Sequence, residues 1–178
     1  MNIQPSIYAI AAAALIFFAA PCQSQERIVE SAHGSFGPHL AVGSVNGFRA
    51  GLRYFPHNAI ALEAAAGYMQ VTLLRENARK EYTDGMSFTF GGSWYSHPEA
   101  GISPMISLLG VYVASATLPD GFSQTRFAIV PSLGSEYYIH HNFSVFFRFG
   151  PAFQFTKELQ KSSFETATQF DAGASILF

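Results

Sequence analysis

The chain has 178 residues, of which 12% are charged and 15% aromatic, and its formal net charge is −2. This near-neutral balance lacks the basic excess of a nucleic-acid-binding protein, so no nucleic-acid partner is expected. The length leaves room for a single domain once a leader is removed.

Residues 7–20 form an uninterrupted apolar run. The run has the length of a signal-peptide core and falls short of the roughly 20 apolar residues of a membrane helix. We therefore expect residues 1–24 to be a cleaved secretory signal peptide and residues 25–178 to be the mature domain. A retained anchor is the alternative, because this leader contains no Lys or Arg.

Cys22 is the single cysteine, and cleavage after Cys22 or after Ser24 both fit the leader. After either cleavage the mature chain has no thiol for a disulfide, a nucleophile or a metal site. Lipidation of Cys22 is a lesser alternative, because the residues before it match the lipobox of bacterial lipoproteins poorly.

Aromatic residues recur about every 40 residues, and a period of this size marks a repeated structural unit. The first three positions are each followed by a short polar turn that contains His. Each unit reads as one hairpin, so four units predict eight strands, the even number typical of outer-membrane barrels. The recurring positions are Tyr54 with Phe55, Trp94 with Tyr95, Tyr137 with Tyr138, and Phe178.

We place strands at residues 36–44, 46–55, 58–69, 85–95, 102–114, 125–138, 143–155 and 168–178. The first has an alternative at residues 27–35, because the Gly-Pro pair at 37–38 favours a bulge or an edge. Longer connections are expected at residues 70–84, 115–124 and 156–167. By the usual asymmetry of such barrels these face the cell exterior and the short turns face the periplasm.

The last strand alternates two chemistries, as strand side chains with a period of two require. Even-numbered residues from Phe170 to Phe178 are apolar, whereas the odd-numbered residues from Gln169 to Leu177, which form the other face, are polar or small except for Leu177. The strand at 143–155 shows the same contrast, with phenylalanines on one face and Arg148 on the other. An apolar face toward lipid and a polar face toward a lumen predict a transmembrane barrel.

The same alternation sends six charged residues inward, three of each sign: Arg49, Arg53, Glu63, Glu136, Arg148 and Asp171. Arg49 and Glu63 are expected to be cross-strand neighbours, because a hairpin turning near residue 57 brings them roughly opposite. In a narrow eight-stranded lumen such charges must pair, so a plugged and rigid interior is the preferred interpretation. A proton or ion path is the alternative.

Five aromatic residues are expected at the level of the lipid headgroups, where an apolar ring meets a polar edge. They are Tyr54, Trp94, Tyr95, Tyr137 and Tyr138. The histidines of the short turns, His57, His97, His140 and His141, come from three hairpins without metal-ligand spacing. We therefore expect solvated turn histidines, no metal and no cofactor.

His141 and Ser144 are the local candidates for a catalytic pair. They lie at the short-turn end, and no convergent set of Ser, His and acid is apparent near the exterior. No enzyme activity is therefore expected. In the first long connection, Arg75, Arg79 and Lys80 are candidates for contact with lipopolysaccharide phosphates, although a solvated loop of mixed charge is the simpler interpretation.

Residues 47–55, residues 60–64 and the Phe-ended final strand resemble the outer membrane protein β-barrel domain family, the small barrels similar to the membrane domain of OmpA. The resemblance covers nearly all of the mature chain. It implies insertion by the barrel-assembly machinery, which reads a terminal aromatic strand, here Phe170, Ile176 and Phe178. That family includes adhesion and envelope-stability proteins.

The expected fold is thus all-β, an eight-stranded antiparallel up-and-down transmembrane barrel in the outer membrane, monomeric and in contact with outer-membrane lipid and lipopolysaccharide. The expected role is structural or one of surface interaction. One alternative is a porin-like transporter of small or hydrophobic solutes, and another is a lipid A-modifying enzyme. A secreted lipocalin-like barrel would place the phenylalanines inside.

Overall fold

The computed structural model describes residues 33–74, 80–97, 101–115, 124–140, 142–158 and 162–178. Its eight strands are β1 (Phe36–Gly43), β2 (Gly47–His57), β3 (Ile60–Leu74), β4 (Lys80–Tyr95), β5 (Ile102–Ser115), β6 (Gln124–His140), β7 (Phe143–Glu158) and β8 (Ser162–Ile176). Within these ranges no helix has the length and apolar character needed to cross a membrane. The expected signal peptide lies outside the described residues.

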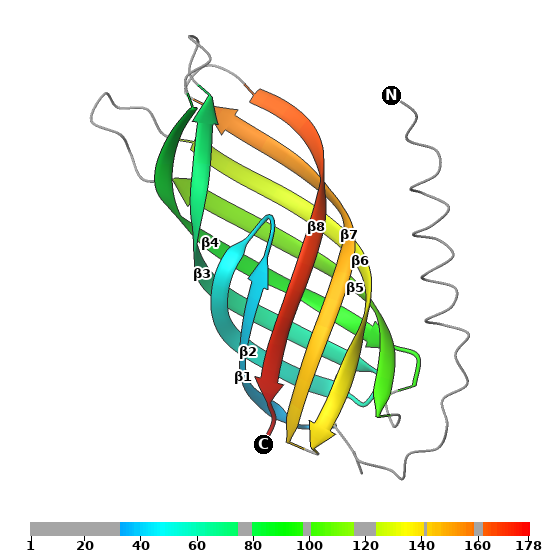
Figure 1. The fold of residues 1–178 in the computed structure, drawn as a ribbon. Helices are drawn as coiled ribbons and strands as arrows, with labels where there is room; N and C mark the ends of the chain where they lie inside the picture. Colours follow the sequence, from blue (N-terminus) through cyan, green and yellow to red (C-terminus); the bar gives the residue numbers. More distant parts are fainter. Residues whose placement is uncertain (1–32, 75–79, 98–100, 116–123, 141, 159–161) are drawn as a thin grey trace.

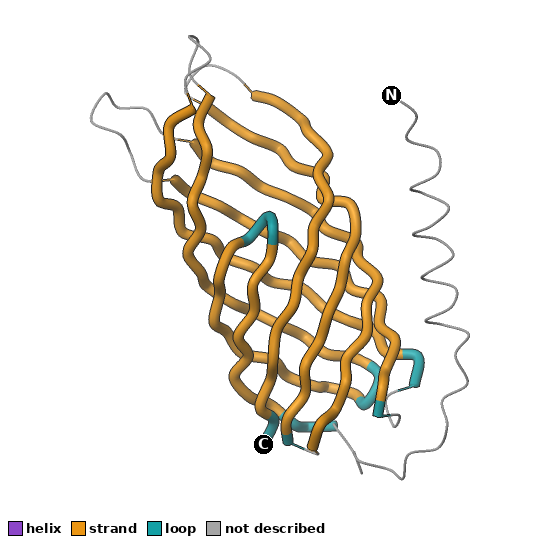
Figure 2. Tube along the Cα trace, in the orientation of Figure 1, coloured by secondary structure: helices purple, strands orange, loops and turns teal. Residues whose placement is uncertain are grey.

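Each strand pairs antiparallel with the next, and β1 pairs with β8 to close the barrel (Figure 1). The strands are tilted relative to the barrel axis, as closure of a barrel requires (Figure 2). The predicted architecture is therefore confirmed. The first strand lies at the expected position near residues 36–44 and not at the alternative, residues 27–35. Pro38 lies within β1, but the β1–β8 ladder begins only at His39, so Pro38 is not part of that ladder.

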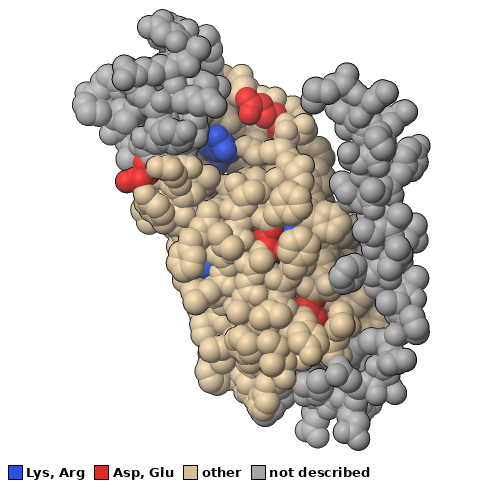
Figure 3. All heavy atoms as spheres, in the orientation of Figure 1, with Lys and Arg blue, Asp and Glu red and all other residues tan. Residues whose placement is uncertain are grey.

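The polarity of the barrel is inverted relative to that of a soluble protein. Phe147, Phe153 and Phe155 are exposed on the outer face of β7, while Arg148 on the same strand is fully buried. Charged atoms are sparse across the middle of the face drawn in Figure 3. The lipocalin-like alternative is wrong, because its phenylalanines would line the interior.

Several strands extend further than the apolar pattern predicted. β3 reaches Leu74, and β4 begins at Lys80 as its register partner, so most of the expected connection at 70–84 is sheet. β7 and β8 likewise extend to Glu158 and Ser162. The residues in these extensions are mostly polar, so apolar alternation fades although backbone pairing continues.

The β1–β2 hairpin is shorter than its neighbours. Its turn, residues 44–46, lies well below the ends of β3 and β8 (Figure 1). Gly47 closes the turn with φ of 65°, a conformation that glycine adopts without steric cost. Val45 and Asn46 are buried, so the turn folds into the barrel.

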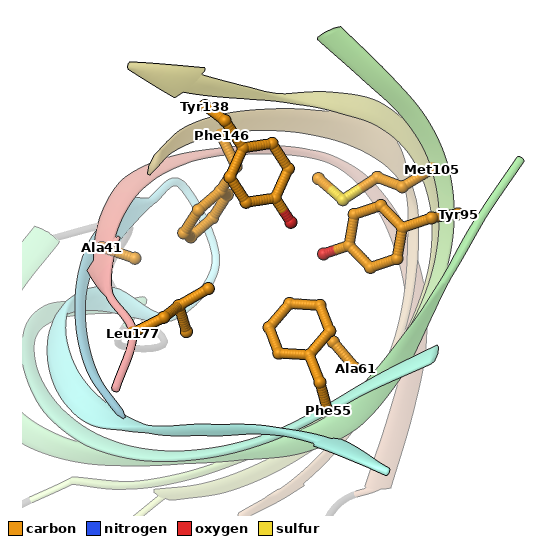
Figure 4. Close-up of a cluster of buried hydrophobic side chains, with 8 residues drawn as sticks. All are labelled: Ala41, Phe55, Ala61, Tyr95, Met105, Tyr138, Phe146 and Leu177. Atoms are coloured by element: carbon orange, nitrogen blue, oxygen red, sulfur yellow. The ribbon is translucent and has the colours of Figure 1, made fainter. Parts of the chain in front are cut away.

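Two apolar clusters fill the interior. The first lies toward the short-turn end and consists of Ala41, Phe55, Ala61, Tyr95, Met105, Tyr138, Phe146 and Leu177 (Figure 4). The second lies in the other half and consists of Val45, Leu109, Val111, Val113, Ala128, Val130 and Ala152, with Met69 packed against it. Charged and polar side chains occupy the space between the two clusters.

Candidate functional site

The six inward charges come from five strands and meet inside the barrel. β2 supplies two arginines, while β3, β6, β7 and β8 each supply one residue. Each is at most 5% exposed. Burial of an ion is costly unless it is paired and hydrogen-bonded, so the contacts of these side chains determine what the site can do.

Asp171 is shared by two arginines. Arg49 donates from Nη1 to Asp171 Oδ1 at 2.8 Å and from Nη2 to Oδ2 at 2.5 Å. Arg148 donates from Nε to the same Oδ2 at 2.7 Å. Two parallel N–H donors fit one carboxylate plane, which makes the Arg49 contact specific as well as strong.

Arg148 extends this chain across the lumen. Its Nη1 and Nη2 atoms donate to the two carboxylate oxygens of Glu63 at 3.0 and 2.6 Å. Glu63 also lies 4.0 Å from Arg49 Nη2 and from Arg53 Nε. One carboxylate therefore faces all three arginines.

A second group centres on Glu136. Arg53 donates to its two oxygens at 2.9 and 3.1 Å, and Ser144 donates to Oε1 at 2.5 Å. The Tyr95 hydroxyl donates to Oε2 at 2.6 Å and accepts a hydrogen bond from Arg53 Nη2. Arg53 Nη1 also donates to Ser175 Oγ at 3.0 Å. Glu136 is thus saturated by partners from three other strands.

The Phe146 ring contacts one arginine from each group. The guanidinium carbons of Arg53 and Arg148 lie 5.0 and 5.1 Å from its ring centroid. Cations over an aromatic face are attracted by the negative face of the ring. Across the whole site, the three arginines and the three carboxylates neutralise one another through their ion pairs.

The expected partner of Glu63 is wrong in detail. The β2–β3 register places Arg53 opposite Glu63, and Arg49 opposite Gly67. We expected the hairpin to turn near residue 57, but it turns one to two residues later. Every β2–β3 residue pair is therefore shifted along the strand. Arg49 reaches Glu63 only diagonally, and its direct carboxylate is Asp171 on β8.

The five expected interfacial aromatics divide into two groups. Tyr54, Trp94 and Tyr137 are exposed on the outer face, at 41–51%. Tyr95 and Tyr138 instead point into the barrel and are almost fully buried (Figure 4). The expectation for these two was wrong, because adjacent strand residues point to opposite faces. Strict alternation from Ser93 and Glu136 predicts this inward placement.

The three expected assembly-signal residues, Phe170, Ile176 and Phe178, all lie on the outer face of the final segment. β8 itself ends at Ile176. The backbone nevertheless continues to pair, since Phe178 exchanges hydrogen bonds of 2.9 and 3.2 Å with Phe36.

Two interior polar residues outside the charged set were not predicted as part of the site: His39 was not identified, and Gln169 was placed on the lumen face without a role. His39 is buried and its ring nitrogens have no hydrogen-bond partner in the described part of the chain. Gln169 accepts from Val45 N at 2.7 Å and donates to Asn46 Oδ1 at 3.2 Å, which holds the β1–β2 turn inward. Inward parity was the available signal for His39 and Gln169.

The alternative sites are placed as follows. Ser144 is fully buried against Glu136, on the interior of the barrel. His141, Arg75 and Arg79, and the side chain of Lys80, lie outside the described residues. No group of three potential metal ligands occurs among the residues that the structure describes.

Fold and interior together define the class of protein: an eight-stranded transmembrane β-barrel of the outer-membrane type. The structure of the N-terminal β-barrel domain of OprF from Pseudomonas aeruginosa is similar to it, with a TM-score of 0.54 over 82% of this chain and 98% of that domain, at 13% identity. This likeness concerns the fold. No family model and no curated protein matches the sequence.

Two more solved structures are similar to the chain at lower scores. CarO from Acinetobacter baumannii matches over 86% of this chain and all of its own, with a TM-score of 0.46 and 10% identity. Ail, the attachment invasion locus protein of Yersinia pestis, matches over 81% of this chain and 95% of its own, with a TM-score of 0.39 and 13% identity.

Proposed function

We propose that this protein is a non-catalytic integral protein of the outer membrane with a sealed lumen, and that its role is structural or one of surface interaction. The observation that carries the proposal is the charged layer between two apolar clusters. In that layer every carboxylate accepts at least two hydrogen bonds from arginines on other strands.

Two features support a sealed lumen: the narrow interior of an eight-stranded barrel and the pairing of its interior charges. An eight-stranded barrel has an interior just wide enough for side chains to fill. Arg49, Arg53 and Arg148 already direct their terminal nitrogens at protein carboxylates, so a passing ion would have to displace buried pairs. Removing one member of a buried pair costs several kcal/mol, on the order of 3–5.

Planar bilayers test this proposal against the transporter alternative. We expect the purified protein to insert without stepwise conductance, while a general porin in the same bilayers gives clear steps. Discrete conductance steps that depend on this protein would overturn the sealed lumen.

Lipid A analysis tests the enzyme alternative. The Ser144 hydroxyl is buried inside the barrel and donates to Glu136, which leaves it poorly placed to attack a lipid. We expect the mass spectrum of lipid A to be the same with and without expression. A protein-dependent loss or gain of an acyl chain would contradict the non-catalytic role.

A further inference from the structure

The barrel wall has a gap at the end that carries the long connections. β2 pairs with β3 as far as Phe48 opposite Tyr68, and β1 pairs with β8 as far as Gly43 opposite Asp171. Beyond these points β3 pairs only with β4, and β8 only with β7, in the described part of the chain. We call this gap the notch, bordered by residues 69–74 of β3, residues 162–168 of β8 and the turn at 44–46.

The notch leaves the first half of β8 unusually open. All residues from 162 to 168 are exposed, on both faces of the strand, whereas Gln169 and Asp171 below them are buried. A strand free on both faces and along one edge presents a row of backbone donors and acceptors. Outer-membrane barrels normally remove such edges by closure.

Hydrogen bonds at the floor of the notch show which backbone groups face it. The carbonyl of Phe170 accepts from Ser44 N at 2.9 Å, and that of Thr168 accepts from Ser44 Oγ at 3.0 Å. Because backbone groups of every second residue point to the same side, the N–H and C=O groups of Phe164 and Thr166 also face the notch. Those of Glu165 and Ala167 face β7.

The notch lies where the outer surface changes from apolar to polar. On the outer face of β3 the exposed Tyr68 is followed by the exposed Gln70, and the Tyr68 hydroxyl donates to Asp84 on β4. Below the turn, the β1–β2 hairpin exposes Val42 and Phe48. Unpaired backbone is not tolerated against hydrocarbon, so the occupant of the notch must offer hydrogen-bonding groups.

The described rim of the notch carries hydroxyl and amide groups. Ser163, Thr166, Thr168 and Gln70 are exposed there, together with the ring of Phe164, and Glu165 is the charged residue among these described side chains. Lys157 is opposite Ser162 but belongs to β7, on the side away from the notch. Alternating donors and acceptors beside a carboxylate suit a neutral sugar, which both donates and accepts, better than a phosphate, which accepts.

We propose that the notch binds the sugar head of a glycolipid in the outer leaflet, with the acyl chains lying on the exposed side chains of Leu40, Val42 and Phe48 beneath it. This rests on the proposed function in that the barrel is an outer-membrane protein, and on the usual asymmetry of such barrels, in which the long connections face the cell exterior. The notch-facing backbone groups of Phe164 and Thr166, which have no partner among the described residues, exchange hydrogen bonds with the sugar hydroxyls. A lipid in its normal orientation places its head above these apolar residues and its chains against them.

A second copy of the chain is a poorer occupant of the notch. Two barrels related by a two-fold axis along the membrane normal have β8 strands that both run from outside to inside. Where the two barrels face each other, their β8 strands tilt in opposite directions. The two β8 edges therefore cross and cannot lie antiparallel along one another. The antiparallel ladder that β1 makes with β8 lower in the wall is not available to such a pair.

Amide hydrogen exchange in nanodiscs tests the proposal. The full-length mature protein is placed in phosphatidylcholine alone, with monogalactosyl diacylglycerol, or with phosphatidylglycerol of the same chain length. We expect the galactolipid to slow exchange at Phe164 and Thr166 by about tenfold or more, because hydrogen-bonded amides exchange only on opening. Glu165 and Ala167 serve as internal controls and remain unchanged, since their amides face β7.

Two variants sharpen the result. Thr166→Pro removes an N–H that faces the notch and leaves the β7 ladder intact, so galactolipid protection at Phe164 is expected to fall. Lengthening the β1–β2 hairpin by four residues on each side of residues 44–46 would fill the notch. In that variant Phe164 and Thr166 are protected without galactolipid and show no further response.

Three outcomes would overturn the glycolipid site: equal protection by phosphatidylglycerol and galactolipid, no protection by either, or protection that appears only when two proteins share one disc. The result is separable from the sealed lumen. A conducting barrel that still shows galactolipid-dependent protection would contradict only the proposed function.

Discussion

Glu63 illustrates how a single buried side chain depends on three others. It accepts two hydrogen bonds from Arg148 and lies 4.0 Å from both remaining arginines. Its loss would leave Arg148 with Asp171, which Arg49 shares, as the partner of a buried guanidinium. Breaking a buried pair is costly, whereas replacing both members by apolar residues is often nearly neutral.

We therefore expect Glu63→Leu to lower the free energy of unfolding by about 3–5 kcal/mol. The measurement is urea unfolding in lipid vesicles, followed by loss of the heat-modifiable form. Glu165→Leu is the matched control, because Glu165 is exposed and its replacement should have little effect.

The double variant Glu63→Leu with Arg148→Met should recover most of that loss. Arg49 then keeps Asp171 and Arg53 keeps Glu136, so the remaining charges are balanced. A double variant no more stable than Glu63→Leu alone would argue against the pair as the source of the effect.

At the scale of the strands, glycine makes room for the charged layer. A Cβ atom added at Gly134 would lie 2.2 Å from the carbonyl oxygen of Phe147 and 2.6 Å from Arg148 Cβ. One of these neighbours is backbone and the other begins the network, so neither can move freely. At Gly92, on the outer face, the nearest atom is the carbonyl oxygen of Ala61 at 3.3 Å.

Gly134→Ala is accordingly expected to destabilise the barrel by about 1–3 kcal/mol, the usual cost of overpacking. Gly92→Ala is the matched control and should change the free energy of unfolding by less than about 0.5 kcal/mol. Both are read from the same vesicle-based urea unfolding curves. Similar effects in the two variants would contradict the packing argument.

We expect the final strand to act in membrane assembly. The Phe178 ring is 69% exposed, so its contribution to packing within the folded chain is small, while its backbone pairs with Phe36. We expect Phe178→Ser to slow assembly into membranes without changing export or the final unfolding midpoint. Pulse-chase analysis of the heat-modifiable form measures this. Assembly at the parental rate would refute an assembly signal at this position.

At the scale of the whole molecule, the inverted polarity of the barrel suits a lipid environment. Large apolar side chains cover the outside, whereas the interior is close to neutral through paired charges. Trp94 is the single tryptophan of the chain and is 51% exposed on the outer face. Its fluorescence therefore reports whether the outer face of the wall contacts lipid, and how deep the short-turn end lies in the membrane.

We expect lipids brominated near the headgroup to quench Trp94 more strongly than lipids brominated at the chain end, because indole rings prefer the interface. The matched control combines Trp94→Phe with Phe55→Trp, which moves the indole to a fully buried interior position. Quenching of that interior indole by brominated chains would contradict the proposed orientation of the wall.

The sequence alone determined the class of fold, because side-chain alternation is a local property of each strand. Phe147 outward and Arg148 inward can be read from two adjacent residues. The same rule, applied consistently, places Tyr95 and Tyr138 inside, although an aromatic at a strand end also resembles a membrane anchor. All six inward charges were identifiable in this way.

Only the tertiary structure decided which of those charges pair. Arg49 and Asp171 are at opposite ends of the sequence and meet because β1 closes on β8, with a register that depends on every hairpin around the barrel. The notch likewise depends on the relative lengths of four strands, and β3 and β8 continue as sheet where the apolar pattern has already ended. Local alternation carries no information about such long-range register, because shifts in each turn accumulate around the wall.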